Sequence, residues 1–329
     1  MKHILFTDLH VGLNINNETW YNLPIKAVEH LTRTARRKNI KSIIFCGDFY
    51  HDRKELSVKA IDSARIICEM LNEFKTHIIC GNHDAYFKNT IELNSLQTID
   101  KFENITIVTK PMVAYEKIGL CPWSLNYREL NTPILMGHFD IKDFKMNDNT
   151  SSIHGEDIKS FKDYKLVISG HFHTHSKKGN VVYLGNMYGH NFNDVDSTRG
   201  YWIFDDESLD MEFVEFEDSP KFIKVIDMDF VESKIKGNIV KVILTKEYSE
   251  QNIIDYLTKL NSLEPLEIDV DYSRIKIDDV QMDISEDINI SSLDEKQIFH
   301  DYLDKITIPD HLKVKTCKKI IDDLFTSTD

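Results

Sequence analysis

The stretch LVISGHFH, residues 166–173, joins a short apolar run to a glycine and then to two histidines. An apolar run of this length that ends at a glycine is typical of a strand buried on both faces of a sheet. His171 and His173 are two residues apart, so on an extended chain their side chains point to the same side. The stretch therefore predicts a buried strand whose carboxyl end carries a pair of metal-type ligands.

A short apolar run that leads to metal-type ligands occurs four more times in the first half of the chain. The further stretches are ILFTDLH (residues 4–10), IIFCGD (43–48), IICGNHD (78–84) and ILMGH (134–138). In a parallel sheet, ligands gather outside the carboxyl ends of the strands. We therefore expect the polar side chains after all five runs to meet at one rim of an α/β fold.

These polar side chains make two sets of divalent-metal ligands that share one carboxylate. We expect Asp48 to bridge two ions roughly 3.5–4 Å apart, because a lone carboxylate has two oxygens to offer. One ion is expected to bind Asp8, His10, Asp48 and His173, and the other Asp48, Asn82, His138 and His171. This mixture of oxygen and nitrogen ligands suits two Mn²⁺ ions and also admits Fe²⁺ or Zn²⁺, whereas Mg²⁺ prefers oxygen ligands alone.

His83 and Asp84 follow Asn82 in the third stretch and are candidate catalytic residues. A histidine beside a metal ligand, with a carboxylate next in sequence, suggests an imidazole that the carboxylate orients. We expect His83 to stabilise the developing negative charge or to protonate the leaving oxygen. The nucleophile would be a hydroxide shared by the two ions, because both ions lower the pKa of bound water.

Each of these residues also has an ordinary structural alternative. A single Asp after a strand usually caps a turn or a helix, and a single buried histidine is usually a hydrogen-bonded core group. Taken alone, Asp8, Asn82 or His138 would favour that alternative. The ordered set DxH, GD, GNHD, GH and GHxH at five strand ends outweighs it and predicts a metal site.

Composition and charge limit the class of protein. The 329 residues are 41% hydrophobic and 29% charged, as in a globular protein with one large domain and one or two small ones. No stretch approaches the roughly 20 apolar residues of a membrane span, and the start does not read as a signal peptide, so we expect a cytoplasmic protein. The net charge of −14 disfavours passive DNA binding. Bound cations would offset several acidic groups, so a metallonuclease is not excluded.

The sequence pattern divides the chain into four parts. Residues 1–218 alternate apolar runs with helix-like segments, which is typical of an α/β domain. Residues 219–277 predict a small α+β module with the order strand, strand, helix, strand. Residues 278–293 are acidic and are expected to form a linker. Residues 294–329 predict two short amphipathic helices.

Two helices are expected inside the first part. Residues 23–38 have an amphipathic pattern that begins near Pro24 and ends in three basic residues, which suit a helix C-terminus. Residues 55–74 carry apolar residues at helical spacing. These helices would cover the sheet that the apolar runs form.

Together, the motifs resemble those of the calcineurin-like metallophosphoesterase superfamily over roughly residues 1–205. Every ligand position expected of that superfamily is filled, in the motifs DLH (8–10), GD (47–48), GNHD (81–84), GH (137–138) and GHFH (170–173). The resemblance implies two mixed β-sheets sandwiched by helices, followed here by a small α+β capping domain and C-terminal helices. It also implies a metal-dependent phosphodiester hydrolase.

The segment GDFYHD, residues 47–52, further resembles the second motif of SbcD-type nucleases, the double-strand-break repair branch of the superfamily. Some members have a histidine three residues after the bridging aspartate, where His51 lies here. The resemblance implies that His51 contacts the DNA phosphate near the metals; its ordinary alternative is a surface turn residue. The short chain is most similar to the nuclease subunit of bacteriophage recombination endonucleases, which implies the host cytoplasm.

The order of the parts also resembles that branch and implies partners. Residues 294–329 would dock on the coiled-coil base of an SMC-like ATPase of the SbcC type; the alternative is that they simply pack on the capping domain. Such a partner could supply the basic surface for DNA that this acidic chain lacks. The resemblance also implies a homodimer built from helices near residues 55–75 and 88–101.

The leading hypothesis is a manganese-dependent DNA nuclease that acts in repair, recombination or replication. It would be a 3′→5′ exonuclease on duplex ends and an endonuclease on single strands. A small-molecule phosphodiesterase or a protein phosphatase on the same scaffold is the first alternative, which the module at 219–277 and the terminal helices disfavour. A non-catalytic scaffold is the second, which the complete ligand set and His83 disfavour.

Overall fold

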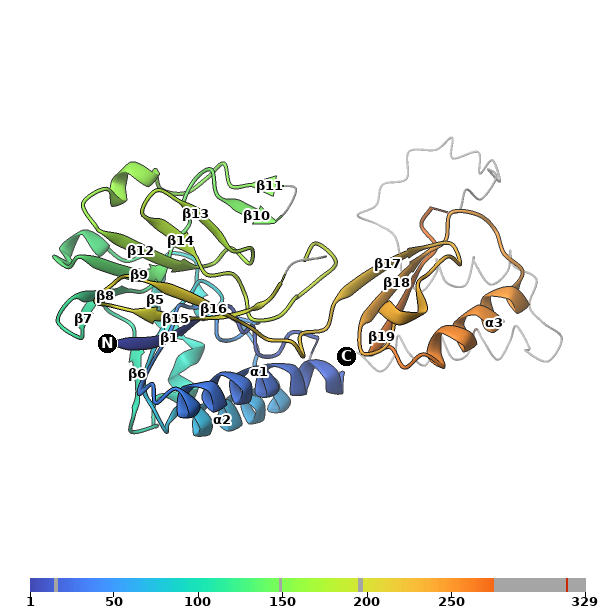
Figure 1. Cartoon of the computed structure of the whole chain (residues 1–329), viewed down its shortest axis with the longest axis horizontal. Coiled ribbons are helices and arrows are strands. Elements are labelled where there is room, and N and C mark those ends of the chain that lie inside the picture. The colour runs from blue at the N-terminus through green and yellow to red at the C-terminus, as the bar shows by residue number, and fades with distance from the viewer. Residues whose placement is uncertain (15–16, 148–149, 195–197, 275–317, 319–329) are drawn as a thin grey trace. The chain divides into compact units, whose positions relative to one another are not determined.

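The computed structural model describes residues 1–14, 17–147, 150–194, 198–274 and 318 (Figure 1). Residues 1–275 form one compact unit. The boundary predicted between residues 218 and 219 falls inside this unit and stays a prediction. The predicted linker and, apart from residue 318, the predicted terminal helices lie outside the described residues.

The first of two six-stranded sheets carries three of the five predicted strands. Its order is β16-β15-β1-β2-β3-β6. The bounds are Lys2–Phe6 (β1), Ser42–Phe45 (β2), Lys75–Ile79 (β3), Ile105–Val108 (β6), Gly200–Asp205 (β15) and Met211–Glu215 (β16). Strands β1, β2, β3 and β6 are parallel, whereas β15 and β16 are antiparallel to their neighbours, so the sheet is mixed.

The second six-stranded sheet carries the other two predicted strands. Its order is β13-β14-β12-β9-β8-β7. The bounds are Met112–Ala114 (β7), Ile118–Cys121 (β8), Ile134–His138 (β9), Leu166–Gly170 (β12), Ser176–Lys178 (β13) and Val181–Tyr183 (β14). Its four central strands are parallel and its two edge strands antiparallel. The two mixed sheets confirm the predicted fold class.

Alternation along each strand decides how the layers pack. In β1, Ile4 and Phe6 join the cluster that contacts the helices, whereas Leu5 between them joins the cluster shared with the second sheet. Met136 and Ile168 of the second sheet lie in that shared cluster. Successive strand residues point to opposite faces, so each central strand is buried on both sides.

Helices α1 (Glu18–Arg37) and α2 (Val58–Leu71) run side by side on the outer face of the first sheet (Figure 1). The prediction that the first helix begins near Pro24 was wrong. The helix begins at Glu18, because the Asn17 side chain accepts a hydrogen bond from the Thr19 N–H and caps it. Pro24 lies inside the helix and removes one main-chain hydrogen bond, but buried Trp20 beside it keeps this turn packed. None of the helices among the described residues has the length and apolarity that a membrane crossing requires.

The prediction of a helix at residues 88–101 was also wrong. This segment holds β5 (Thr90–Asn94), which pairs with β4 (Ala85–Phe87), and then a 3-10 helix at Ser95–Ile99. Thr90 and Ile91 are β-branched and favour a strand. Further short elements are β10 (Lys145–Asn147), β11 (Thr150–Ser151) and 3-10 helices at Tyr127–Glu129, Ile158–Phe161 and Glu232–Lys234.

The module that follows β16 in the chain has the predicted order strand, strand, helix, strand. Its elements are β17 (Phe222–Ile226), β18 (Ile239–Ile243), α3 (Glu250–Asn261) and β19 (Glu267–Asp271). The three strands form a parallel sheet of their own. Val225, Val240, Val242 and Leu260 make a separate apolar cluster in it, so α3 covers this sheet.

Candidate metal centre

The five predicted strand ends meet at one rim. Strands β1, β2 and β3 are parallel in the first sheet, and β9 and β12 are parallel in the second, so their carboxyl ends lie together. They carry the seven side chains expected to bind metal: Asp8, His10, Asp48, Asn82, His138, His171 and His173. The structure brings all seven together, as the following distances show.

Asp8, His10 and Asp48 form the first group, with one candidate ligand atom of each within 4.8 Å of the others. His10 Nε2 lies 3.8 Å from Asp8 Oδ1 and 3.8 Å from Asp48 Oδ2. His173 joins this group, because its Nε2 lies 3.7 Å from Asp8 Oδ1. These separations are too long for hydrogen bonds and suit atoms that converge on an ion.

Asp48, His138 and His171 form a second group within the same 4.8 Å limit. His138 Nε2 lies 3.2 Å from Asp48 Oδ2. Asn82 Oδ1 lies 2.9 Å from His138 Nε2 and 2.9 Å from His171 Nδ1, so the amide oxygen belongs to this group. Asp48 is thus a member of both groups, the position expected of a bridging carboxylate.

Four of the seven residues have a left-handed backbone, which is uncommon for residues with a side chain. The angle φ is +54° at Asp8, +46° at His10, +61° at Asp48 and +92° at His171. Conformations of this kind cost free energy and concentrate at functional sites, where the surrounding structure enforces them. Here they turn the chain just past β1, β2 and β12.

The glycines that begin two of the motifs are required by close packing. A Cβ atom at Gly47, where φ is +101°, would lie 2.3 Å from His138 Nδ1. A Cβ atom at Gly170 would lie 2.1 Å from Thr7 Oγ1. The glycine in GD and GHxH therefore lets the strand ends approach closely enough for the side chains beyond them to meet.

Unpartnered buried atoms at the rim show that the donor set fits a cation. Asp8 Oδ1 and His10 Nε2 are buried and have no hydrogen-bond partner among the described residues. Burial of an unpaired carboxylate oxygen is costly, and a bound cation would remove that cost. His138 Nδ1 donates to the Cys46 carbonyl at 2.8 Å, which leaves Nε2 as the ligand atom.

The pKa shifts of Asp48 and His138 also indicate a site that attracts positive charge. Burial would lower the pKa of His138, but the Asp48 carboxylate raises it to about 9. Burial would raise the pKa of Asp48, but His138 and the imidazoles of His10 and His83 hold it below its ordinary value. The carboxylate therefore attracts positive charge at this point, and a divalent ion that binds would displace the proton of His138.

His83 and His51 lie next to the first group. The rings of His83 and His10 are 4.7 Å apart, edge to face, and the rings of His51 and His83 stack at 5.7 Å. His83 Nδ1 donates to the His51 carbonyl oxygen at 2.7 Å, and the His83 main-chain N–H donates to Asp48 Oδ1 at 2.8 Å. Both predicted histidines are thus beside the metal groups, and His83 keeps Nε2 for other contacts.

The expectation that Asp84 orients His83 was wrong. The buried Asp84 carboxylate accepts four main-chain N–H bonds instead, from Asp48 (3.1 Å), Phe49 (3.0 Å), Tyr50 (3.0 Å) and Gly81 (2.9 Å). Buried main-chain N–H groups require acceptors, and this carboxylate supplies them for all four, whereas His83 finds a carbonyl. Asp84 therefore fixes the loop that carries Asp48 rather than an imidazole.

Asp84→Asn is expected to destabilise the protein by about 1–3 kcal/mol, because one carboxylate oxygen becomes an NH₂ group that faces N–H donors. Urea unfolding of the variant and the parent protein measures this difference. Asp52→Asn is the matched control, since this exposed carboxylate caps the Lys54 N–H and asparagine can do the same. Equal stability of Asp84→Asn and the parent would contradict the assigned role.

Sequence reasoning missed His190, which also lies at the first group. Its ring centroid is 4.9 Å from that of His10 and 4.7 Å from that of His173. Burial, His173 and His10 hold the pKa of His190 well below its ordinary value, so the ring is neutral. The pair Gly189-His190 repeats the Gly-His of two motifs but follows no apolar run, and that pair was the only signal available.

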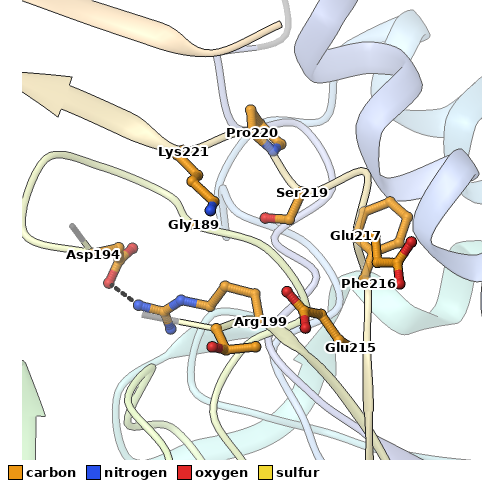
Figure 2. A pocket seen from close by; sticks show the side chains of 10 residues that line it. Gly189, Asp194, Arg199, Glu215, Phe216, Glu217, Ser219, Pro220 and Lys221 are labelled. Atoms are coloured by element: carbon orange, nitrogen blue, oxygen red, sulfur yellow. Dashed lines mark hydrogen bonds and ion pairs between the residues drawn. The ribbon is translucent and has the colours of Figure 1, made fainter. Parts of the chain in front are cut away.

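A buried ion pair between Asp194 and Arg199 links the segment that carries His190 to the loop that carries His173. Asp194 Oδ1 accepts from Arg199 Nη2 at 3.0 Å, as Figure 2 shows at the wall of a small pocket. Arg199 Nη1 also donates to the carbonyl oxygen of His173. Both residues are almost fully buried. The pair therefore ties the segment after β14 to the loop that carries His173.

Comparison with known proteins agrees with the motifs. The calcineurin-like phosphoesterase family model matches residues 1–175. Exonuclease subunit 1 of Enterobacteria phage T4 is 29% identical over 328 residues, which cover 93% of this chain and 93% of that protein. The SbcD component of the SbcCD nuclease of Staphylococcus epidermidis is 24% identical over 364 aligned positions, which cover 93% and 94%. A solved archaeal phosphodiesterase is 13% identical and covers 66% of this chain and 100% of its own, with a TM-score of 0.36.

Proposed function

Because the chain belongs to the calcineurin-like phosphoesterase family, we propose that it is a two-metal DNA nuclease that hydrolyses phosphodiester bonds. The observation that carries the proposal is the pair of ligand groups that share Asp48. We assign Asp8, His10, Asp48 and His173 to one ion, and Asp48, Asn82, His138 and His171 to the other. When bound, the two ions would activate a water and neutralise charge on the phosphate. The mixed oxygen and nitrogen donors favour Mn²⁺ over Mg²⁺.

The two histidines beside the ligand groups would act on the phosphate and the leaving group. His83 Nδ1 carries a proton toward the His51 carbonyl, so Nε2 is the atom that would donate to the leaving oxygen or to the developing charge. Burial, His10 and His83 lower the pKa of His51 to about 4. The His51 ring is therefore neutral and would contact a DNA phosphate as a hydrogen-bond donor rather than as a charge.

DNA as the substrate is supported by the two relatives that align over 93% of this chain, both of which are named as components of nucleases. From the resemblance of the motifs to those of SbcD-type nucleases, we further propose 3′→5′ exonuclease action on duplex ends and endonuclease action on single strands. A comparison of the hydrolysis of DNA and of a small phosphodiester tests whether DNA is the substrate. We expect kcat/KM with Mn²⁺ to be higher for linear duplex DNA than for an aryl phosphodiester. Efficient aryl hydrolysis with intact DNA would favour the small-molecule alternative.

A partner subunit is proposed because both relatives are named as one component of a larger nuclease, the SbcCD nuclease in one case and an exonuclease in the other. The partner would be an SMC-like ATPase with a coiled coil. Its docking site would be residues 294–329, which carry amphipathic patterns in the sequence and lie, apart from residue 318, outside the described residues.

Deleting residues 285–329 is expected to abolish capture of the protein by the purified ATPase while basal nuclease activity is kept. The reason is that the deletion removes both amphipathic segments and none of the proposed ligands. A pull-down with tagged ATPase, with the full chain as the control, measures capture, and the duplex assay measures activity. Undiminished capture of the truncated chain would refute docking through these segments.

Self-association is proposed through the face formed by α2 and the segment at 88–101. Three apolar side chains of these two segments are exposed: Val58 (84%), Ile61 (44%) and Leu93 (48%). If they form one contiguous patch in the dimer interface, burial of that patch would support association. A homodimer of this type would present two metal centres to one DNA molecule.

A further inference from the structure

His190 has a buried nitrogen that the fold leaves without a partner. The residue is 6% exposed, and its Nε2 atom is buried without a hydrogen-bond partner among the described residues. A neutral imidazole has one donor and one acceptor nitrogen, and an unpaired buried nitrogen is costly. A histidine that served only to pack the core would be expected to pair this atom or to be replaced by an apolar residue.

The unpartnered nitrogen lies among the proposed ligands of the first ion. Candidate ligand atoms of His10, His173 and His190 lie within 4.8 Å of one another. Asp8 Oδ1 and His10 Nε2 are the two unpartnered buried atoms of the proposed ligands. His190 thus adds a third unpartnered buried atom, Nε2, on a residue of the same cluster.

Hydrogen bonds to one buried carboxylate fix the main chain at His190. Asp194 Oδ2 accepts from the His190 N–H at 2.7 Å and from the Asn191 N–H at 3.4 Å. The other oxygen of Asp194 accepts from Arg199 (Figure 2). Arg199 donates in turn to the His173 carbonyl oxygen. One buried ion pair thus fixes His173 and His190 relative to each other, as the support of a metal ligand usually does.

We propose that His190 is an additional ligand of the ion bound by Asp8, His10, Asp48 and His173. This inference rests on the proposed two-metal function and adds a residue that the motifs do not contain. The first ion would then have three imidazoles and two carboxylates, whereas the second has two imidazoles, one carboxylate and one amide oxygen. More nitrogen ligands favour the later divalent metals, so the first position would retain Co²⁺ or Zn²⁺ more strongly than the second.

The first test is cobalt binding by His190→Leu, because leucine fills a similar space without a nitrogen. Titration of the metal-free full chain with Co²⁺, followed by visible absorption, reports both affinities and the ligand field. We expect one of the two dissociation constants to rise about 10- to 100-fold, the other to stay unchanged, and the absorption bands of the weakened site to shift.

His175→Leu is the matched control, since His175 lies two residues after His173 but bonds the Tyr183 carbonyl and contacts Trp202 instead of the metal groups. We expect this variant to bind both Co²⁺ ions as the parent does. Two unchanged dissociation constants in a folded His190→Leu protein would overturn the proposal while leaving the two-metal function in place.

The second test uses the unaltered protein and so does not depend on how a variant folds. A zinc-loaded crystal, with the ions placed by anomalous scattering, should show His190 Nε2 about 2.0–2.1 Å from the first ion. Two ions with His190 outside bonding distance would overturn the His190 assignment alone. A centre that binds no ion would overturn the two-metal function as well.

Discussion

Replacing His83 with alanine is expected to lower DNA hydrolysis by roughly 10²- to 10⁴-fold while both ions still bind. The side chain is beside the first ligand group without being in either proposed ligand set, and its Nδ1 is committed to the His51 carbonyl oxygen. The contact of residue 83 with Asp48 comes from the main-chain N–H, which alanine keeps. Loss of the imidazole should therefore affect turnover and leave the metal ligands in place.

The measurement pairs single-turnover rates on duplex DNA with the metal content of the same samples. His30→Ala serves as the control, because His30 lies on α1 against Tyr201 and Phe216, away from the metal groups. Turnover by His83→Ala equal to that of the parent would remove His83 from the mechanism. Loss of turnover together with loss of metal would make it a structural residue instead.

Replacing Asp48 with alanine is expected to remove both ions, from two per chain to nearly none. Asp48 is the residue that belongs to both ligand groups, with Oδ2 at 3.2 Å from His138 Nε2 and at 3.8 Å from His10 Nε2. The remaining ligands of each ion would then be mainly imidazoles, with one carboxylate or one amide oxygen. Activity should fall with the metal, because the activated water needs both ions.

Elemental analysis after dialysis against Mn²⁺ tests this expectation. Asp52→Ala is the matched control, because Asp52 is an exposed carboxylate only four residues away that bonds the Lys54 N–H. We expect the control to keep two ions per chain. Full occupancy in Asp48→Ala would contradict the bridging role, and loss of one ion would assign Asp48 to a single ion.

The sequence could predict the strands, and through them the convergence of the site, because each apolar run is short and precedes a polar ligand type, and four of the five runs lead into a glycine. Parallel strands then place those residues at one rim without further information. Gly47 and Gly170 illustrate the reason, since each lies so close to a neighbouring strand end that no other residue fits. The glycine that marks the end of the strand in the sequence is therefore the same residue that lets the strand ends approach in the fold.

The features that were missed depend on contacts that no local pattern records. The start of α1 is decided by the Asn17 cap and the burial of Trp20, which outweigh the breaking tendency of Pro24. Asp84 is adjacent to His83 in sequence, but its carboxylate accepts hydrogen bonds from the main-chain N–H groups after β2 instead of from the His83 ring. His190 reaches the site only because Asp194 and Arg199 fold its segment back toward His173.

An assay of the purified protein with Mn²⁺ and duplex DNA labelled at either end, with and without a chelator, decides whether the chain is a two-metal nuclease. We expect metal-dependent shortening from the 3′ end that the chelator abolishes. Intact DNA in the presence of two bound ions per chain, with or without the partner ATPase and ATP, would contradict this expectation.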